Sequence, residues 1–102
     1  MKIGVPSSKL KTESFEIAAD EGEAIAIAVG YYLATGKVGK AYMDSNGLAN
    51  ALEPLTSLCL PYRIPVELII AKRTDKPWHA VMGERTEEIL KMINYEDKAS
   101  IK

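Results

Sequence analysis

Residues 66–71 read VELIIA, and this short stretch decides the fold class. It is rich in β-branched residues and almost continuously apolar, which is typical of a strand in a covered parallel sheet. Residues 39–44 (GKAYMD) and 2–5 (KIGV) also read as strands, and residues 14–19 (SFEIAA) form a weaker one.

The longest segment between these strands, residues 20–36, reads DEGEAIAIAVGYYLATG. Its AIAIAV portion alternates like a strand, but about fifteen residues is long for a strand and ordinary for a helix. Asp20 and Glu23 have the spacing of a capping box, and Gly36 is a typical C-terminal stop. We therefore predict a helix over Glu21–Thr35, apolar on nearly all sides and buried on more than one of them.

Two more helices are predicted after this one, over residues 48–60 with a bend or restart at Pro54, and over residues 85–94 with Thr86 as a cap. We expect residues 72–83 to form a loop and the polar tail, residues 96–102, to fray. The order β-β-α-β-α-β-α predicts one α/β domain over residues 1–102, with an open, mostly parallel sheet and helices on both faces.

Composition narrows the class of protein. The 102 residues are 47% hydrophobic, the formal net charge is −1, and the pI is near 5.8. These values predict a globular protein without nucleic-acid or membrane partners, and no apolar run reaches the length of a membrane span. A single cysteine and the absence of a signal-peptide pattern predict a cytoplasmic location. No paired-cysteine or His-x-x-x-His spacing occurs, so we expect no metal ligands in this chain.

Ligands of open parallel sheets gather beyond the carboxyl ends of the strands. The segments expected there hold most of the polar side chains that could act, which are Ser7, Ser8, Glu21, Glu23, Asp44, Ser45, Asn46, Asn50, Arg73, Asp75 and His79.

Each of these residues also has a structural interpretation. The acidic group at residues 20–23 could simply cap a helix and complement its dipole. Asn46 and Gly47 could supply the backbone angles of a tight turn, and His79 could be a packed loop histidine. Composition and periodicity alone do not decide between these alternatives.

A resemblance to a known family favours the functional alternative. Residues 20–73, from DEGEAIAIAVGYYLATG to VELIIAKR, closely resemble the pyrimidine-binding domain of thiamine-diphosphate enzymes. The most similar branch is the phosphonopyruvate and sulfopyruvate decarboxylases. GVPSSKL (residues 4–10) and DKPWHAVMGERTEEIL (residues 75–90) resemble further motifs of this branch.

The resemblance implies roles for particular residues. It places on Glu21 the glutamate that hydrogen-bonds the pyrimidine ring and favours the tautomer that starts catalysis, while Asp20 and Glu23 keep the capping role. Gly47 and Asn50 would also contact the cofactor. Ser45, Asn46 and His79 would bind the phosphonate or sulfonate end of a small 2-oxo acid, because the turn SNGLAN leads into a helix N-terminus.

The resemblance also implies a divided enzyme. Thiamine diphosphate and its Mg²⁺ would be held by a separate diphosphate-binding subunit, in a homodimer or hetero-oligomer, and this chain alone would be inactive. The chain departs from the family pattern in a shorter segment before Asp20, in Asp44-Ser45-Asn46 for Gln-Asn-Ser, and in Trp78-His79 for Gln-His. The alternative is therefore a degenerate, non-catalytic interaction or assembly module of the same fold.

Overall fold

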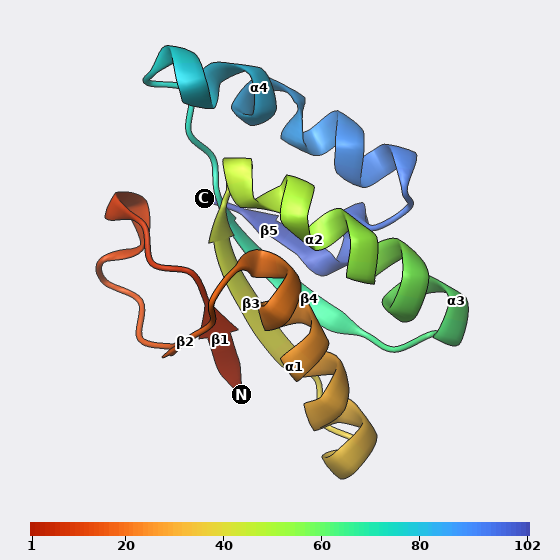
Figure 1. Cartoon of the computed structure of the whole chain (residues 1–102). Coiled ribbons are helices and arrows are strands. Elements are labelled where there is room, and N and C mark those ends of the chain that lie inside the picture. The colour runs from red at the N-terminus through yellow and green to blue at the C-terminus, as the bar shows by residue number, and fades with distance from the viewer.

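The computed structural model describes residues 1–102 and contains a five-stranded, all-parallel sheet with the order β2-β1-β3-β4-β5 (Figure 1). The strands are β1 (Lys2–Gly4), β2 (Glu16–Ile17), β3 (Gly39–Asp44), β4 (Val66–Ala71) and β5 (Ala99–Ile101). The longest pairing joins β3 to β4, with Gly39 opposite Val66 and Asp44 opposite Ala71. The predicted open parallel α/β sheet is confirmed.

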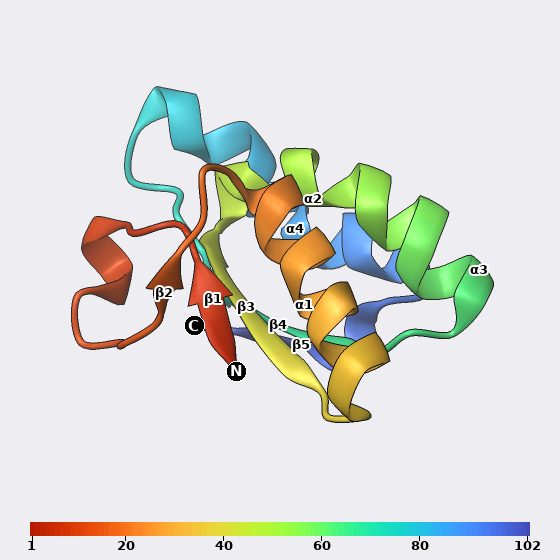
Figure 2. The ribbon, with the colours of Figure 1, turned by 60° about the horizontal axis from the view of Figure 1, so that its bottom comes forward.

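Helices lie on both faces of the sheet, as predicted, but very unequally. One face carries α1 (Glu21–Thr35), α2 (Leu48–Pro54), the π-helical turn η3 (Leu55–Cys59), α3 (Leu60–Tyr62) and α4 (Pro77–Met92). The other face carries the short 3₁₀ helix η1 (Ser8–Leu10). Figure 2 shows α1, α2 and α4 on one side of the strands and the red η1 turn on the other.

The order of the strands explains this division. The chain steps from β1 to β2 in one direction, then crosses back to β3, β4 and β5 in the other. Because crossovers between parallel strands are right-handed, a reversal of direction moves the connecting segment to the opposite face. Only the β1–β2 connection runs in the first direction, so η1 alone covers that face.

The main core lies between the sheet and the larger helices. Alternate residues of β3 and β4 point into it, among them Ala41, Met43 and Leu68, each without exposed surface. Ala24, Ile25, Ala28 and Val29 of α1 pack on them, and α2 adds Leu48 and Ala51. One side of α1 is therefore buried, while Ile27 and Leu33 on its outer side are 37% and 70% exposed. No helix combines the length and apolar character needed to cross a bilayer.

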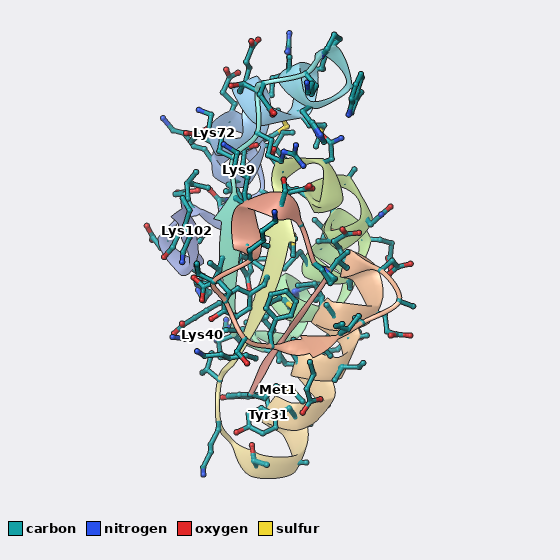
Figure 3. All side chains as sticks on the ribbon, turned by 90° about the vertical axis from the view of Figure 1, so that its left-hand side faces the viewer. Met1, Lys9, Tyr31, Lys40, Lys72 and Lys102 are labelled. Atoms are coloured by element: carbon teal, nitrogen blue, oxygen red, sulfur yellow. The ribbon has the colours of Figure 1, made fainter.

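The second face of the sheet is only partly covered. Phe15 stacks on Tyr42 with ring centroids 4.9 Å apart, and Leu10 of η1 packs beside them. Further along β3 and β4, Lys40 and Glu67 are directly opposite each other and form a surface ion pair at 4.0 Å. Lys40 is labelled in Figure 3. Parallel sheets are usually covered on both faces. The apolar sequence of β4 predicted such a covered sheet, but part of this second face is exposed to solvent.

The prediction that the tail frays is wrong. Residues 99–101 form β5, which pairs in parallel with β4, and Lys102 N donates to the Ile70 carbonyl at 2.8 Å. Ala99 and Ile101 pack against the main core. The tail is held because β4 would otherwise leave an unpaired edge, whose backbone groups β5 satisfies.

The predicted loop over residues 72–83 is wrong for its second half. The helix α4 begins at Pro77 rather than at residue 85, and Pro77 occupies its first turn, where proline is favoured. Thr86 is therefore no cap. It is fully buried, and its Oγ1 donates to the Met82 carbonyl at 2.7 Å. Gly83 sits inside the helix because a Cβ there would collide with the Arg73 carbonyl.

The predicted bend at Pro54 is confirmed as a change of helix type. Proline has no backbone N–H to donate within a helix. Immediately after Pro54 the chain widens into the π-helical turn η3, in which Leu60 N donates to the Leu55 carbonyl. Arg63 then ends the helical segment in the left-handed conformation, with φ at 56°.

Candidate active site

The polar residues predicted to act gather where the strand order reverses. β1 is followed by β2 on one side, and the chain reaches β3 on the other side of β1. Ligands of open α/β sheets bind in the crevice beyond the carboxyl ends of strands at such a switch point. The segments that leave β2, β3 and β4 all begin at this edge, at residues 18–21, 45–50 and 72–79.

Two of the three acidic residues at the start of α1 cap the helix, as predicted. Asp20 Oδ1 accepts a hydrogen bond from Glu23 N at 2.8 Å. Glu23 Oε1 in turn accepts from Ala19 N at 2.8 Å, one residue upstream of the usual capping-box partner. The capping role therefore falls on Asp20 and Glu23 and leaves the Glu21 carboxylate free for another purpose.

Glu21 is the first residue of α1, and its side chain is largely buried. It keeps only 8% of its surface exposed, although it is ionisable. Asn50 Nδ2 donates to its Oε1 atom at 3.0 Å. Its Oε2 atom makes no hydrogen bond within the chain and is not among the fully enclosed unpartnered atoms. The site thus holds one carboxylate oxygen in place and leaves the other available to a ligand.

Gly47 lies directly against this carboxylate. Its φ and ψ are −69° and −17°, which any residue can adopt, and Asn46 has no positive φ either. Residues 45–47 do form the tight turn between β3 and α2 that the structural interpretation of Asn46 and Gly47 expects, as a 3₁₀ helix, but its angles do not require glycine. Glycine is required for space instead, because a Cβ at residue 47 would collide with the Glu21 carboxylate. Glu21, Gly47 and Asn50 come together as one group.

A second group links η2 (Ser45–Gly47) to the segment after β4. Ser45 is fully buried, and its Oγ accepts a hydrogen bond from Arg73 N at 3.1 Å. Asn46 Nδ2 donates to the Trp78 carbonyl in the first turn of α4 at 3.0 Å. Ser45 thereby has a structural task, while Asn46 uses only one end of its amide.

The second group also contains polar atoms without a partner. Asn46 Oδ1 and His79 Nδ1 are buried and make no hydrogen bond, and the buried Arg73 Nε has only a long ion-pair contact with Asp75 Oδ1, at 3.5 Å. His79 lies in the first turn of α4 with 9% of its surface exposed, so it is not a loop histidine. A buried polar group left unsatisfied costs about 1–3 kcal/mol. These three atoms mark the part of the molecule where a polar ligand would gain most.

Arg73 was expected among the polar side chains at this edge without a specific binding role, and the structure places it at the centre of this group. Its guanidinium lies 3.8 Å from Asp44 Oδ2 and 3.5 Å from Asp75 Oδ1, and 16% of its side chain is exposed. Burial alone would raise the pKa of Asp75, but its own backbone amide and Arg73 outweigh that effect and lower it. The signal in the sequence was position, since Asp44 ends β3 and Arg73 follows β4 by two residues.

The two groups flank η2 but do not merge. Glu21 contacts the Gly47 side of the turn, and the first turn of α4 contacts the Asn46 side. No hydrogen bond or ion pair joins Glu21 to His79. The two hollows in the molecular surface lie at the opposite edge of the sheet, near the starts of β4 and β5.

This arrangement suits a cofactor with a heteroaromatic ring. A buried carboxyl with one free oxygen can hold a ring nitrogen, and a glycine beside it lets backbone approach closely. No cluster of three metal-ligating side chains is present. The residues are compatible in kind with the pyrimidine end of thiamine diphosphate, the cofactor that the resemblance implies.

Comparison with known proteins agrees with the motifs. The chain is 41% identical to the phosphonopyruvate decarboxylase of Streptomyces viridochromogenes, across 74% of this chain and 20% of that protein. It is 36% identical to sulfopyruvate decarboxylase subunit alpha of Methanocaldococcus jannaschii, across 72% of this chain and 45% of that subunit. The corresponding subunit of Methanothermobacter thermautotrophicus is 30% identical across 89% of this chain and 63% of its own length.

The chain thus spans about a fifth of the phosphonopyruvate decarboxylases that it matches. No family model matches it. The resemblance to this branch that the motifs predict is confirmed.

Proposed function

The chain is homologous to part of the phosphonopyruvate decarboxylases and of the sulfopyruvate decarboxylase alpha subunits, and on that premise we propose that it is the pyrimidine-binding part of a thiamine-diphosphate-dependent decarboxylase. The observation that carries the proposal is the Glu21 carboxylate, buried, fixed at one oxygen by Asn50 and free at the other. Neither capping nor the helix dipole requires such an arrangement, because Asp20 and Glu23 already serve the helix end.

Three residues would act on the cofactor ring. Thiamine diphosphate, when bound, supplies the group that accepts electrons as a 2-oxo acid loses carbon dioxide. Glu21 Oε2 would bond a ring nitrogen of the pyrimidine and hold or pass a proton there. Asn50 fixes the orientation of the carboxyl, and Gly47 leaves the room in which it sits.

The second group would receive the charged end of the substrate. Arg73, His79 and Asn46 bring a guanidinium, an imidazole with an unpartnered Nδ1 and an amide to one place. A phosphonate or sulfonate would accept hydrogen bonds from the Arg73 and His79 nitrogens. Asn46 would donate only through the second hydrogen of Nδ2, because its unpartnered Oδ1 is an acceptor. Asp44 limits the preference for anions, because it lies 3.8 Å from Arg73 and takes up part of its charge. We assign 3-phosphonopyruvate or 3-sulfopyruvate as the substrate class.

A partner subunit completes the proposed enzyme. Two of the relatives are named as alpha subunits, which supports a hetero-oligomer with a diphosphate-binding subunit that holds Mg²⁺. The outer side of α1 offers a surface for this contact or for a homodimer, because Ile27, Gly30 and Leu33 are exposed there without a charge between them. Exposed apolar patches of this kind commonly mark interfaces.

The deciding experiment combines this chain with a diphosphate-binding protein from the same genome, recognised by its Gly-Asp-Gly motif. Carbon dioxide release from 3-phosphonopyruvate and 3-sulfopyruvate is measured with thiamine diphosphate and Mg²⁺, for each protein alone and for the mixture. We expect turnover only in the mixture. Turnover by this chain alone would contradict the divided enzyme, and a stable mixture that binds no cofactor would contradict the decarboxylase.

The second candidate is a non-catalytic module that assembles with the same partner. It is favoured by the Asp44–Arg73 contact and by the minimal cover that η1 gives to the second face. The mixture separates the two functions, since the module predicts a complex without turnover and without cofactor binding.

A further inference from the structure

The more apolar of the molecule's two hollows lies far from Glu21, at the edge of the sheet where β4 begins. It encloses about 270 Å³. Its walls come from the C-terminal half of α1, from the end of α3 and from the segment between α4 and β5, which contribute Tyr32, Arg63, Ile64, Pro65, Tyr95 and Lys98. In Figure 1 this edge is the end of the sheet next to α3.

The hollow is built by rigid features of the backbone. The π turn η3 carries Cys59 and is followed by Leu60, and both line the floor. The Tyr95 hydroxyl donates to the Val66 carbonyl at 2.6 Å and accepts from Val66 N at 3.1 Å. These two bonds fix the tyrosine ring as a wall beside the first residue of β4. The hollow is therefore a preformed shape and not a gap between mobile side chains.

The charged groups that line this hollow are cations, although Lys98 also borders the neighbouring hollow, which Glu67 and Asp97 line. The only ionisable groups of the first hollow that carry charge near neutral pH are Arg63 and Lys98, and no carboxylate lines it. Neither cation takes part in any of the five ion pairs of the chain. The Lys98 ammonium lies over the Tyr95 ring, 5.7 Å from its centroid. Arg63 and Lys98, which form no ion pair, thus line the same hollow as apolar and aromatic side chains.

We propose that this hollow binds a small organic monoanion, a carboxylate with an aromatic or branched apolar body. The body would bury against Leu60, Ile64 and the tyrosine rings, and the carboxylate would lie between Arg63 and Lys98. Ligand pockets usually enclose about 300–1,000 Å³, so a volume near the lower limit selects a small ligand. An inorganic anion would leave the apolar floor without contacts. This site is separate from the proposed decarboxylase site and does not depend on that function.

The test uses the full chain and two probes that differ in charge, benzoate and benzyl alcohol. Amide chemical shifts are followed by NMR as each probe is added. We expect saturable shifts at Ile64 and Tyr95 with benzoate, and weaker binding of benzyl alcohol at the same residues. Shifts centred on Glu21 and Asn50, equal affinity for the two probes, or no saturable shift near the hollow would each overturn the proposal.

Variants identify the cations. Arg63→Asn removes the charge while keeping a residue that tolerates the positive φ at this position. Lys98→Met removes the second charge and keeps an apolar stem over Tyr95. Each should weaken benzoate binding roughly two- to fivefold, as for an exposed ion pair, and leave benzyl alcohol unchanged. Lys9→Met, at an exposed lysine outside the hollow, is the matched control. Unchanged benzoate affinity in both hollow variants would contradict the assignment.

Discussion

The Glu21 carboxylate occupies the space into which a side chain on Gly47 would extend. The two residues come from α1 and η2, which are separated by β3 in sequence. Gly47→Ala should therefore lower the free energy of unfolding by about 1–3 kcal/mol through overpacking. Chemical denaturation measures this loss.

A double-mutant cycle isolates the contact. Glu21→Ala removes the carboxylate, so Gly47→Ala should cost much less in that background than in the wild-type chain. Gly47 has ordinary helical φ and ψ, so no backbone penalty remains to obscure the result. If Gly47→Ala lowered the free energy of unfolding equally in both backgrounds, glycine would be needed at this position for backbone reasons and not for its contact with Glu21.

The second prediction concerns the proton of Glu21. Glu21→Gln keeps an oxygen that can accept from Asn50 Nδ2 but loses the group that holds and passes a proton. A positioned acid or base is typically worth about 10²–10⁴-fold in rate, and we expect a loss of that order in the complex with the partner. NMR of C2 proton exchange in the bound cofactor measures it. Glu23→Gln is the control, because its side chain can still accept from Ala19 N. Equal exchange in wild type and Glu21→Gln would refute the role.

The third prediction concerns the substrate end. His79 carries a buried, unpartnered Nδ1, so His79→Ala should raise KM for the 2-oxo acid more than it weakens cofactor binding. Trp78→Ala is the neighbouring control. Its side chain is 69% exposed, and the backbone carbonyl that accepts from Asn46 is retained. Steady-state kinetics of the assembled enzyme distinguish the two, and identical KM values for both variants would exclude His79 from binding.

The fourth prediction concerns Tyr95, whose hydroxyl satisfies both backbone groups of Val66. Tyr95→Phe leaves a buried N–H and a buried carbonyl without partners, and each such group costs about 1–3 kcal/mol. Thermal or chemical unfolding should reveal a loss of roughly 2–6 kcal/mol in total. Tyr32→Phe, at another tyrosine of the same hollow with no hydrogen bond to its hydroxyl, should change stability by far less. Similar losses in both variants would show that ring packing, and not the hydroxyl, governs this edge.

The fifth prediction follows from Cys59. Burial raises the pKa of its thiol to about 11, with a hydrogen bond to Tyr95 opposing the shift. Above the ordinary thiol pKa, the unfolded chain releases this proton and the folded chain keeps it, so the unfolded state binds fewer protons. The free energy of unfolding should therefore fall as pH rises from about 9 to 11, by up to about 1.4 kcal/mol per pH unit. Cys59→Ala should have a flatter profile over this range, and superimposable slopes would contradict the burial of a neutral thiol.

Much of the fold could be predicted because local signals agreed with the tertiary structure. The bounds of α1, Glu21–Thr35, follow from Asp20, Glu23 and Gly36, which act at its ends as the sequence indicates. β4 follows from its β-branched and almost continuously apolar sequence. The start of α4 was hidden because Pro77 and Gly83 resemble helix breakers. Pro77 is tolerated in the first turn, and Gly83 reflects a close approach to Arg73 that only the packed chain creates.

The site could be predicted in its members but not in its contacts. The motifs pointed to Glu21, Gly47 and Asn50, and the structure brings them together. They could not show that the missing side chain of Gly47 leaves room for the Glu21 carboxylate. Nor could they show that the Ser45 hydroxyl accepts a hydrogen bond from Arg73 N. Asp44 and Arg73 meet because β3 and β4 pair in register, a relationship between residues 29 positions apart that no local pattern encodes.

The π turn Leu55–Cys59 lies between α2 and α3. It changes the angle at which the side chains after it point around the helix axis, relative to those before it. Each residue advances an α-helix by about 100° around its axis. The extra residue of a π turn therefore rotates everything after it by that angle relative to a regular continuation. Asn50, which precedes the turn, keeps its angle toward Glu21 whatever follows, whereas Cys59 and Arg63 owe theirs to the inserted residue. Inserting or deleting one residue at this turn would thus rotate the side chains of Cys59 and Arg63 around the helix axis. Asn50 would keep its position beside the Glu21 carboxylate.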